Sequence, residues 1–139
     1  MTTKKLENLV AIVTGSGGGL GAECARVLAS HGAKLVVVDI NGDAAKSVVA
    51  ELESAGHEAI AVQTDVSSET DVKAMIEKTE AHFGRIDILH NNAAVLSIEQ
   101  RQRDRDICNL DMDAWDRAIA VNLRGAVLCS KYAIPARAL

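Results

Sequence analysis

The fold of this chain is decided by the stretch Val13-Thr14-Gly15-Ser16-Gly17-Gly18-Gly19-Leu20-Gly21. An apolar run of strand length, Leu9–Val13, leads into it, and a stretch compatible with a helix, Leu20–Ser30, leads out of it. Glycine tolerates the sharp turn that joins a buried strand to a following helix. We therefore predict that residues 9–30 form a strand, a tight glycine turn and a helix.

The spacing of the glycines indicates what this turn does. The pattern G-x-G-x-x-G fails because Leu20 holds the third glycine place, whereas T-G-x-x-x-G-x-G fits at Thr14, Gly15, Gly19 and Gly21. In this interpretation Gly15 allows the exit from the strand, Gly19 lets the backbone approach a pyrophosphate, and Gly21 lets the helix pack closely. The alternative is a flexible turn, but the position between a strand and a helix N-terminus favours phosphate binding.

Apolar runs and glycine stops alternate along the rest of the chain in the order βαβαβαβα. We predict strands at 9–13, 34–40, 58–63 and 86–90, with helices at 20–30, 44–54, from 67 or 68 to 83, and from 111 onward. This alternation predicts one three-layer α/β domain over 1–139, with a parallel sheet of about four strands in the order 3-2-1-4. The mixed-charge run 99–106 is interpreted as a solvated loop.

An acidic residue at the end of the second strand indicates the class of nucleotide. Asp39 stands 18 residues beyond Gly21, where a carboxylate can accept both ribose hydroxyls and would repel a 2′-phosphate. The alternative is a turn former, since Asn41 and Gly42 follow at once. With the glycine turn in place we favour the ribose role, which predicts NAD rather than NADP.

Composition excludes several other functions. The net charge of −4, without blocks of like charge, argues against nucleic-acid binding. Cys24, Cys108 and Cys129 are too far apart for a metal site and are interpreted as reduced core thiols; the four histidines are equally dispersed. Apolar runs are too short to span a membrane, so we expect a cytoplasmic protein. With 2% aromatic residues, the core must consist of Val, Ile, Leu and Ala.

At this point the sequence resembles the short-chain dehydrogenase/reductase family over Leu9–Pro135. The motifs that carry the resemblance, in order, are Thr14-Gly15-(x)3-Gly19-x-Gly21, Asp65-Val66, Asn91-Asn92-Ala93-Ala94, and Trp115-Asp-Arg-Ala-Ile-Ala-Val-Asn-Leu-Arg-Gly125. The resemblance implies a Rossmann-type NAD(P)-binding domain and an oxidoreductase that transfers hydride between a secondary alcohol or ketone and the nicotinamide. It also implies a small-molecule substrate in the full-length enzyme. Family members that prefer NADP often have a basic residue where this chain has Gly18, which agrees with Asp39.

The resemblance also assigns site residues. It places Asp65 at the adenine amino group and the Asn92 segment beside the ribose and nicotinamide. The predicted cofactor-binding residues are Gly15, Ser16, Gly18, Gly19, Leu20, Gly21, Asp39, Ile40, Asp65, Val66, Asn92, Ala93 and Ala94.

Asn122 corresponds to the family's catalytic-site asparagine, which holds a water in a proton relay. It shares a predicted apolar helix face with Trp115, Ala118, Ile119 and Ala126. An asparagine on such a face must find hydrogen-bond partners or cost about 1–3 kcal/mol. The alternative role is therefore to satisfy a neighbouring backbone carbonyl, and both roles are compatible.

The family's catalytic Tyr-x-x-x-Lys pair and its upstream serine are absent from this chain. The lysine of such a pair lowers the pKa of the tyrosine from about 10 toward 7. Here the single tyrosine, Tyr132, is followed four residues later by Ala136, and Ser130 precedes the expected serine position. We interpret Tyr132 as a packing residue and expect no turnover.

Residues 136–139 contain no helix stop signal, so we expect a domain truncated at its C-terminus. The open edge of the fourth strand and the last helix, apolar on several sides, then predict a homo-oligomer. The alternative function is a non-catalytic dinucleotide-binding or oligomerisation module.

Overall fold

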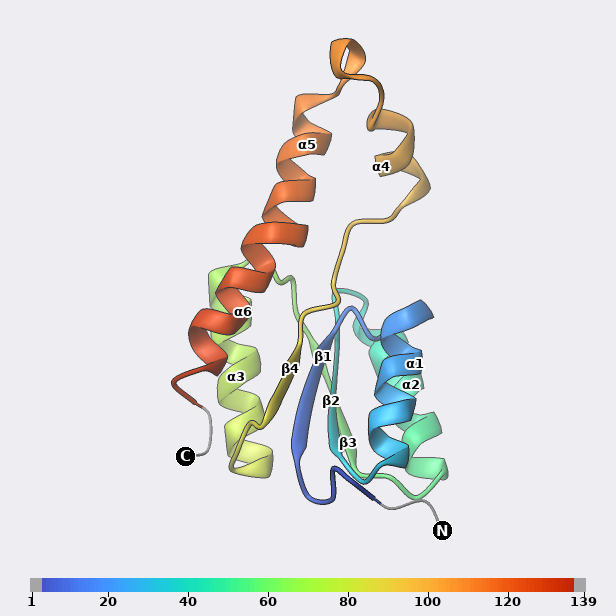
Figure 1. Ribbon diagram of the computed structural model, residues 1–139, viewed down its shortest axis with the longest axis vertical. Coiled ribbons are helices and arrows are strands. Elements are labelled where there is room, and N and C mark those ends of the chain that lie inside the picture. The colour runs from blue at the N-terminus through green and yellow to red at the C-terminus, as the bar shows by residue number, and fades with distance from the viewer. Residues whose placement is uncertain (1–3, 137–139) are drawn as a thin grey trace.

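The computed structural model describes residues 4–136 and contains a single four-stranded sheet (Figure 1). Its strands are β1 (Val10–Thr14), β2 (Lys34–Asp39), β3 (Ala59–Gln63) and β4 (Ile88–His90). All neighbouring strands are parallel, in the order β3-β2-β1-β4. The predicted α/β class and strand order are therefore confirmed.

Helices cover both faces of the sheet. Helices α1 (Gly19–Ser30) and α2 (Gly42–Ser54) lie on one face, and α3 (Glu69–Phe83) and α6 (Gly125–Ala133) lie on the other (Figure 1). Alternate residues of each strand enter separate cores, so that Ile12 faces α3 and α6 while Val13 faces α1 and α2. Both cores consist largely of Val, Ile, Leu and Ala, as the composition predicts. Within residues 4–136 no helix is both long enough and apolar enough to cross a bilayer.

The ends of the helices follow from local sequence. The side chains of Asn41 and Ser68 cap α2 and α3 by accepting from backbone N–H groups three residues on, and Gly84 ends α3 with a φ of 75°. Helix α1 differs, because its N-cap is Gly18 and no side chain accepts a hydrogen bond there. The N-terminus of α1 is thus left for another partner.

The segment after β4 is more regular than predicted. Residues 99–103 of the mixed-charge run belong to helix α4 (Ile98–Arg103), so its interpretation as a loop was wrong there, and the 3₁₀-helix η1 (Ile107–Asn109) follows the run. Neither helix has a buried residue, so the run is solvated as predicted. The Ser97 hydroxyl caps α4, and Arg103 forms an ion pair with Asp111 at 2.9 Å. These short-range contacts stabilise helical turns in a segment that has no apolar periodicity.

The last helix, predicted from Asp111 onward, begins at Met112, and the Asp111 side chain caps it. It comprises α5 (Met112–Ala118), the π-helical segment η2 (Ile119–Arg124) and α6.

The apolar face predicted for this helix is not the face that it buries. Trp115 is 48% exposed and Ile119 39% exposed, while the side toward the core contains Ala114, Val121, Gly125, Leu128 and Cys129. The helix is turned this way because Gly125 lies directly against Val66, where a Cβ atom would be 2.7 Å from Val66 Cγ2.

Candidate functional site

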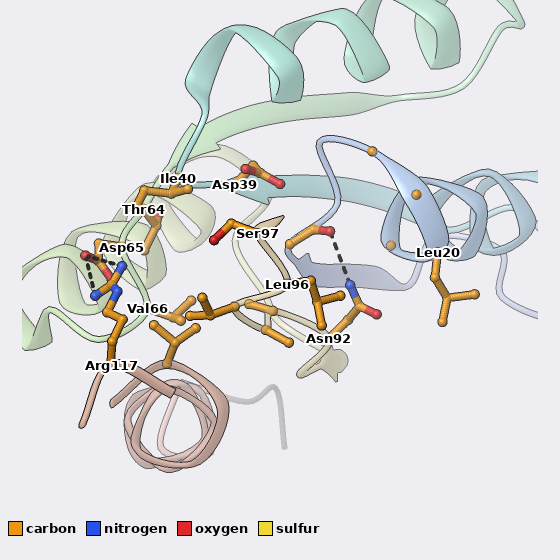
Figure 2. Close-up of a pocket in the computed structure, with 18 residues that line it drawn as sticks. Leu20, Asp39, Ile40, Thr64, Asp65, Val66, Asn92, Leu96, Ser97 and Arg117 are labelled. Atoms are coloured by element: carbon orange, nitrogen blue, oxygen red, sulfur yellow. Dashed lines mark hydrogen bonds and ion pairs between the residues drawn. The ribbon is translucent and has the colours of Figure 1, made fainter. Parts of the chain in front are cut away.

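A cavity of about 450 Å³ lies at the carboxyl ends of the four strands (Figure 2). Parallel α/β sheets bind ligands at this edge, and the volume suits a small-molecule ligand. Every predicted cofactor-binding residue except Ser16 lines the cavity: Gly15, Gly18, Gly19, Leu20, Gly21, Asp39, Ile40, Asp65, Val66, Asn92, Ala93 and Ala94.

The loop between β1 and α1 forms one wall of the cavity. Gly15 and Gly19 have φ values of +65° and +52°, which favour glycine. A Cβ atom on Gly21 would lie 2.2 Å from the carbonyl oxygen of Gly15, so the start of α1 is packed tightly against the loop. In front of Gly18 and Gly19, by contrast, a Cβ atom would meet nothing within 4 Å. The glycine loop is thus tightly packed against the protein at Gly21, and it is open toward the cavity at Gly18 and Gly19.

The N-terminus of α1 supplies hydrogen-bond donors to the same wall. Its first backbone bond within the helix runs from Ala22 N–H to the Gly18 carbonyl at 3.2 Å. The preceding N–H groups, of residues 19–21, have no place in the helical ladder, and the helix dipole makes this end partly positive. The wall therefore suits an anionic group such as a diphosphate.

Ser16 lies beneath the loop. Its hydroxyl donates to the Val13 carbonyl at 2.6 Å and accepts from the Val38 N–H at 3.1 Å, and the residue is fully buried. Ser16 thus joins the ends of β1 and β2 rather than lining the cavity.

Asp39 extends from the end of β2 toward the glycine loop. One carboxylate oxygen accepts from Gly17 N–H and the other from Asn41 N–H, each at 2.9 Å. An ionised carboxylate offers about four acceptor positions, so both oxygens retain capacity for ligand hydroxyls. Gly17 is needed here because a Cβ atom would be 2.9 Å from the Asp39 carboxyl carbon.

Asp65 follows β3 and is held by two partners. Its Oδ1 accepts from the Ser67 N–H at 2.9 Å and the Ser67 hydroxyl at 2.6 Å, while Arg117 of α5 faces Oδ2 at 3.5 Å (Figure 2). Partial burial alone would raise the pKa of Asp65, but these hydrogen bonds and the Arg117 cation outweigh it and lower the pKa. Asp65 is therefore an ionised acceptor at the edge of the cavity.

Sequence reasoning missed several residues of the cavity wall. Arg117 lies within the Trp115–Gly125 motif, yet nothing in its spacing indicates that it reaches Asp65. Thr64 adjoins Asp65 in the sequence, and its buried hydroxyl has no hydrogen-bond partner within the described residues. The wall also includes Val95, Leu96, Ser97 and Val121.

Asn92 joins the end of β4 to the glycine loop. Its side-chain amide donates to the carbonyls of Thr14 and Gly15, at 3.1 and 3.2 Å. In return the Thr14 hydroxyl accepts from the backbone N–H groups of Asn92 and Ala93, each at 3.1 Å. These bonds fix Ala93 against Gly15, where an added Cβ atom would be 2.8 Å from Ala93 Cα. These contacts hold the glycine loop after β1 and the segment after β4 together at the base of the cavity.

Asn122 lies in the π-helical segment η2 and is exposed. Its Oδ1 accepts from the Val95 N–H at 2.8 Å, so this partner is a backbone donor, whereas the alternative role named a backbone carbonyl. Because Val95 lines the cavity, Asn122 positions the chain that leaves β4. π-Helical segments are frequent at functional sites.

Tyr132 lies away from the cavity, and its predicted packing role is confirmed. Its ring packs against the core, with the ammonium groups of Lys73 and Lys131 5.2 and 5.0 Å from the ring centroid. Its hydroxyl donates to Glu69 Oε1, which also accepts from Lys131 at 2.9 Å. The hydrogen bond from the Tyr132 hydroxyl, which has the largest effect, and the contact with Lys131 lower the pKa of Glu69 to about 2.

The three cysteines are unpaired. Cys129 is buried, and burial raises the pKa of its thiol to about 11, whereas Cys108 is exposed and so was wrongly assigned to the core. Residues 4–136 contain no group of three or more His, Cys, Asp or Glu side chains able to hold a metal ion.

Comparison with known proteins defines the family. The sequence profile of the short chain dehydrogenase family matches residues 9–138. The chain therefore belongs to the short-chain dehydrogenase family. An uncharacterized oxidoreductase of Thermotoga maritima is 39% identical over 127 residues, which are 91% of this chain and 47% of that protein.

Solved structures agree with this assignment. A short chain dehydrogenase from Mycobacterium avium superimposes with a TM-score of 0.86 at 35% identity, covering 94% of this chain and 46% of that one. A 7α-hydroxysteroid dehydrogenase complexed with NADH and 7-oxo glycochenodeoxycholic acid gives a TM-score of 0.85 at 33% identity, covering 96% and 50%. The chain spans about half the length of the curated relatives it matches.

Proposed function

We propose that this chain binds NAD in preference to NADP and is the cofactor-binding half of a short-chain oxidoreductase. In the whole enzyme hydride passes between a secondary alcohol or ketone of a small-molecule substrate and the nicotinamide. The observation that carries this proposal is the cavity that joins the uncapped N-terminus of α1 to the Asp39 carboxylate. The NADH-bound hydroxysteroid dehydrogenase supports it by its similar fold.

The residues present fit a nicotinamide dinucleotide. The open space in front of Gly18 and Gly19 admits the diphosphate to the N–H groups of α1. Asp39 accepts from the adenosine ribose, and Asp65 lies further along the cavity, where its free acceptor capacity suits the base. The segment 92–94 lines the remaining part, toward the nicotinamide. When bound, the nicotinamide supplies the hydride acceptor or donor, and these residues orient it.

Preference for NAD follows from charge. A 2′-phosphate on the adenosine ribose would bring about two negative charges toward the Asp39 carboxylate, and like charges at close range repel. Calorimetric titration of the 139-residue protein should therefore give a lower Kd for NAD than for NADP. Equal binding, or tighter binding of NADP, would overturn the proposed preference.

For Asn122 we propose a double role. Its bond to Val95 fixes the chain beside the cavity in this structure. In the whole enzyme its side-chain amide supports the proton relay of the active site.

We expect binding without turnover from these residues alone. The sequence has no Tyr-x-x-x-Lys pair, and Tyr132 is engaged with Glu69 outside the cavity. The protein should bind NAD yet form no NADH from a panel of secondary alcohols, followed by absorbance. Robust NADH formation would show that another acid–base group operates here.

A second function, as an oligomerisation module, is favoured by one observation. The outer side of α5, η2 and α6 exposes a row of large apolar side chains: Met112, Trp115, Ile119, Leu123, Val127 and Ile134. We propose that this row contributes to a homo-oligomer, with or without NAD.

A further inference from the structure

One end of the cavity presents a hydrogen-bond acceptor and a hydrogen-bond donor side by side. The acceptor is Asp65 Oδ2, and the donor is the guanidinium of Arg117, whose Nη1 and Nη2 each lie 3.5 Å from that oxygen (Figure 2). Both residues line the cavity although they are 52 positions apart in the sequence. A ligand that reaches this end therefore meets both groups.

Ser67 anchors both groups. Ser67 orients the carboxylate by donating its N–H and hydroxyl to Oδ1, and its hydroxyl oxygen accepts from Arg117 Nη1 at 2.9 Å. The direct Asp65–Arg117 contact at 3.5 Å is long for a hydrogen bond. Oδ2 and the guanidinium can therefore each turn to a ligand while their anchoring bonds to Ser67 remain.

The walls of this end suit a flat ring. Ile40 and Val66, which lie near Asp65 (Figure 2), line it with aliphatic carbon, and Ile40 is 55% exposed. Along the sheet edge the order runs from the glycine loop after β1 to Asp39 after β2 and Asp65 after β3. A dinucleotide with its diphosphate at the loop and a ribose at Asp39 therefore places its base beside Asp65 and Arg117.

We propose that Arg117 is a specificity-determining residue that, together with Asp65, lets this site accept both 6-aminopurine and 6-oxopurine dinucleotides. This proposal rests on the proposed binding of NAD. With adenine, the 6-amino group donates to Asp65 and no donor from Arg117 is needed. With hypoxanthine, the ring N1–H donates to Asp65 and the 6-oxo group accepts from Arg117. Asp65 alone would provide no donor for the oxo group.

The test is calorimetric titration of the full chain with NAD and with nicotinamide hypoxanthine dinucleotide. The wild-type Kd values should differ by less than about threefold. In the Arg117→Ala variant the hypoxanthine form should bind at least about tenfold more weakly than NAD, because a hydrogen bond to a charged donor is lost. Arg117→Lys retains a cationic donor, and its ratio should fall between those of the wild type and the alanine variant.

Arg124→Ala is the matched control, because Arg124 is exposed on the same continuous helix and does not line the cavity. It should keep the wild-type ratio, and melting curves should show all variants folded. A wild-type ratio above about tenfold, or an unchanged ratio in Arg117→Ala, would overturn the proposal. Failure of the wild type to bind either dinucleotide would instead reject the proposed function itself, and this proposal with it.

Discussion

The glycines between β1 and α1 serve different purposes, although the sequence presents them as one cluster. Position 21 requires glycine, because the Gly15 carbonyl and the Asn92 amide leave no room there for a Cβ atom. Gly18 has an extended backbone, with φ of −178°, and open space where a side chain would extend. Only Gly18 of these two could carry a side chain without a change in the protein's own structure.

We predict that Gly21→Ala destabilises the fold, whereas Gly18→Ala does not. A Cβ atom on residue 21 would lie 2.2 Å from Gly15 O and 2.6 Å from Asn92 Nδ2, so α1 or the loop must move. Overpacking of this kind costs about 1–3 kcal/mol of unfolding free energy. Thermal denaturation followed by circular dichroism should show a lower Tm for Gly21→Ala only. Equal Tm values for both variants would contradict this account of the turn.

A second prediction concerns the charge of Asp39. Asp39→Asn keeps the size of the side chain and one acceptor oxygen but removes the negative charge. We expect the Kd for NAD to rise about tenfold, since a hydrogen bond from a ribose hydroxyl to a charged acceptor is lost. The Kd for NADP should fall, because the repulsion of the 2′-phosphate is relieved.

The control for this prediction is Asp43→Asn, in which an exposed carboxylate is removed from the first turn of α2. It should leave the NAD to NADP ratio unchanged in the same titrations. If Asp39→Asn also leaves that ratio unchanged, Asp39 does not face the ribose.

Sequence reasoning found the residues whose roles are local. Gly15 and Asp39 stand at the ends of strands that the apolar pattern marks, and Gly19 begins the helix after the first strand, so their place at one sheet edge follows from the parallel order. Arg117 and Thr64 carry no such signal. Arg117 meets Asp65 only because the fold brings α5 beside the segment that follows β3. The buried Thr64 hydroxyl is without a partner among the described residues, which no sequence pattern indicates.

At the scale of elements, α3 and α6 are joined at their polar ends by one carboxylate. Glu69 in the first turn of α3 accepts from both Lys131 and Tyr132 of α6. These contacts lower the pKa of Glu69 from its ordinary 4.5 to about 2. A depressed pKa in the folded state means that the contacts stabilise the fold above pH 4.5 and that this stabilisation is lost as the pH falls toward 2.

We therefore predict that Glu69→Gln changes the response of stability to acid. The variant should be less stable than the wild type near neutral pH and should lose less stability between about pH 4.5 and 2. Urea denaturation at a series of pH values measures both effects. Glu77→Gln, which alters an exposed carboxyl group on the same helix, should follow the wild-type curve. Parallel curves for Glu69→Gln and the wild type would show that the contact does not form.

The elements with an apolar period were predictable, and those without it were not. Strand and helix alternation up to Phe83 followed from apolar runs and capping residues such as Ser68 and Gly84. Helices α4 and η1 depend on side-chain caps and ion pairs, which leave no apolar pattern. The orientation of α5, η2 and α6 depends on the close approach of Gly125 to Val66, a contact between distant segments.

In the whole molecule, the sheet has open edges at β3 and β4, and two kinds of surface are available to a second copy: a sheet edge and an apolar helix face. Strand β4 is at the edge of the sheet and pairs only with β1 within the described residues. An unpaired strand edge can form backbone hydrogen bonds with another chain. The second surface is the apolar row along α5, η2 and α6, in which Leu123 is 60% and Val127 59% exposed.

The apolar row is more extensive than either sheet edge, because β4 contains three residues and β3 five. Large exposed side chains recur along it at steps of three, four or seven residues, so they lie near one side of the helix. Contiguous exposed apolar surface of this kind marks interaction sites. We therefore expect helix packing, rather than strand pairing, to dominate self-association.

The final prediction is that the protein self-associates through this row, with Trp115 as the reporter. Trp115 is the single tryptophan and belongs to the row, so its emission should shift to shorter wavelength as protein concentration rises. Sedimentation should show species larger than a monomer over the same range.

The double change Leu123→Glu and Val127→Glu should restore a monomer, since association would bury the new charges. Val27→Glu, on an exposed position of α1, should not. A monomer at all concentrations would remove the proposed oligomer, and a variant that still associates would assign the contact to an edge of the sheet.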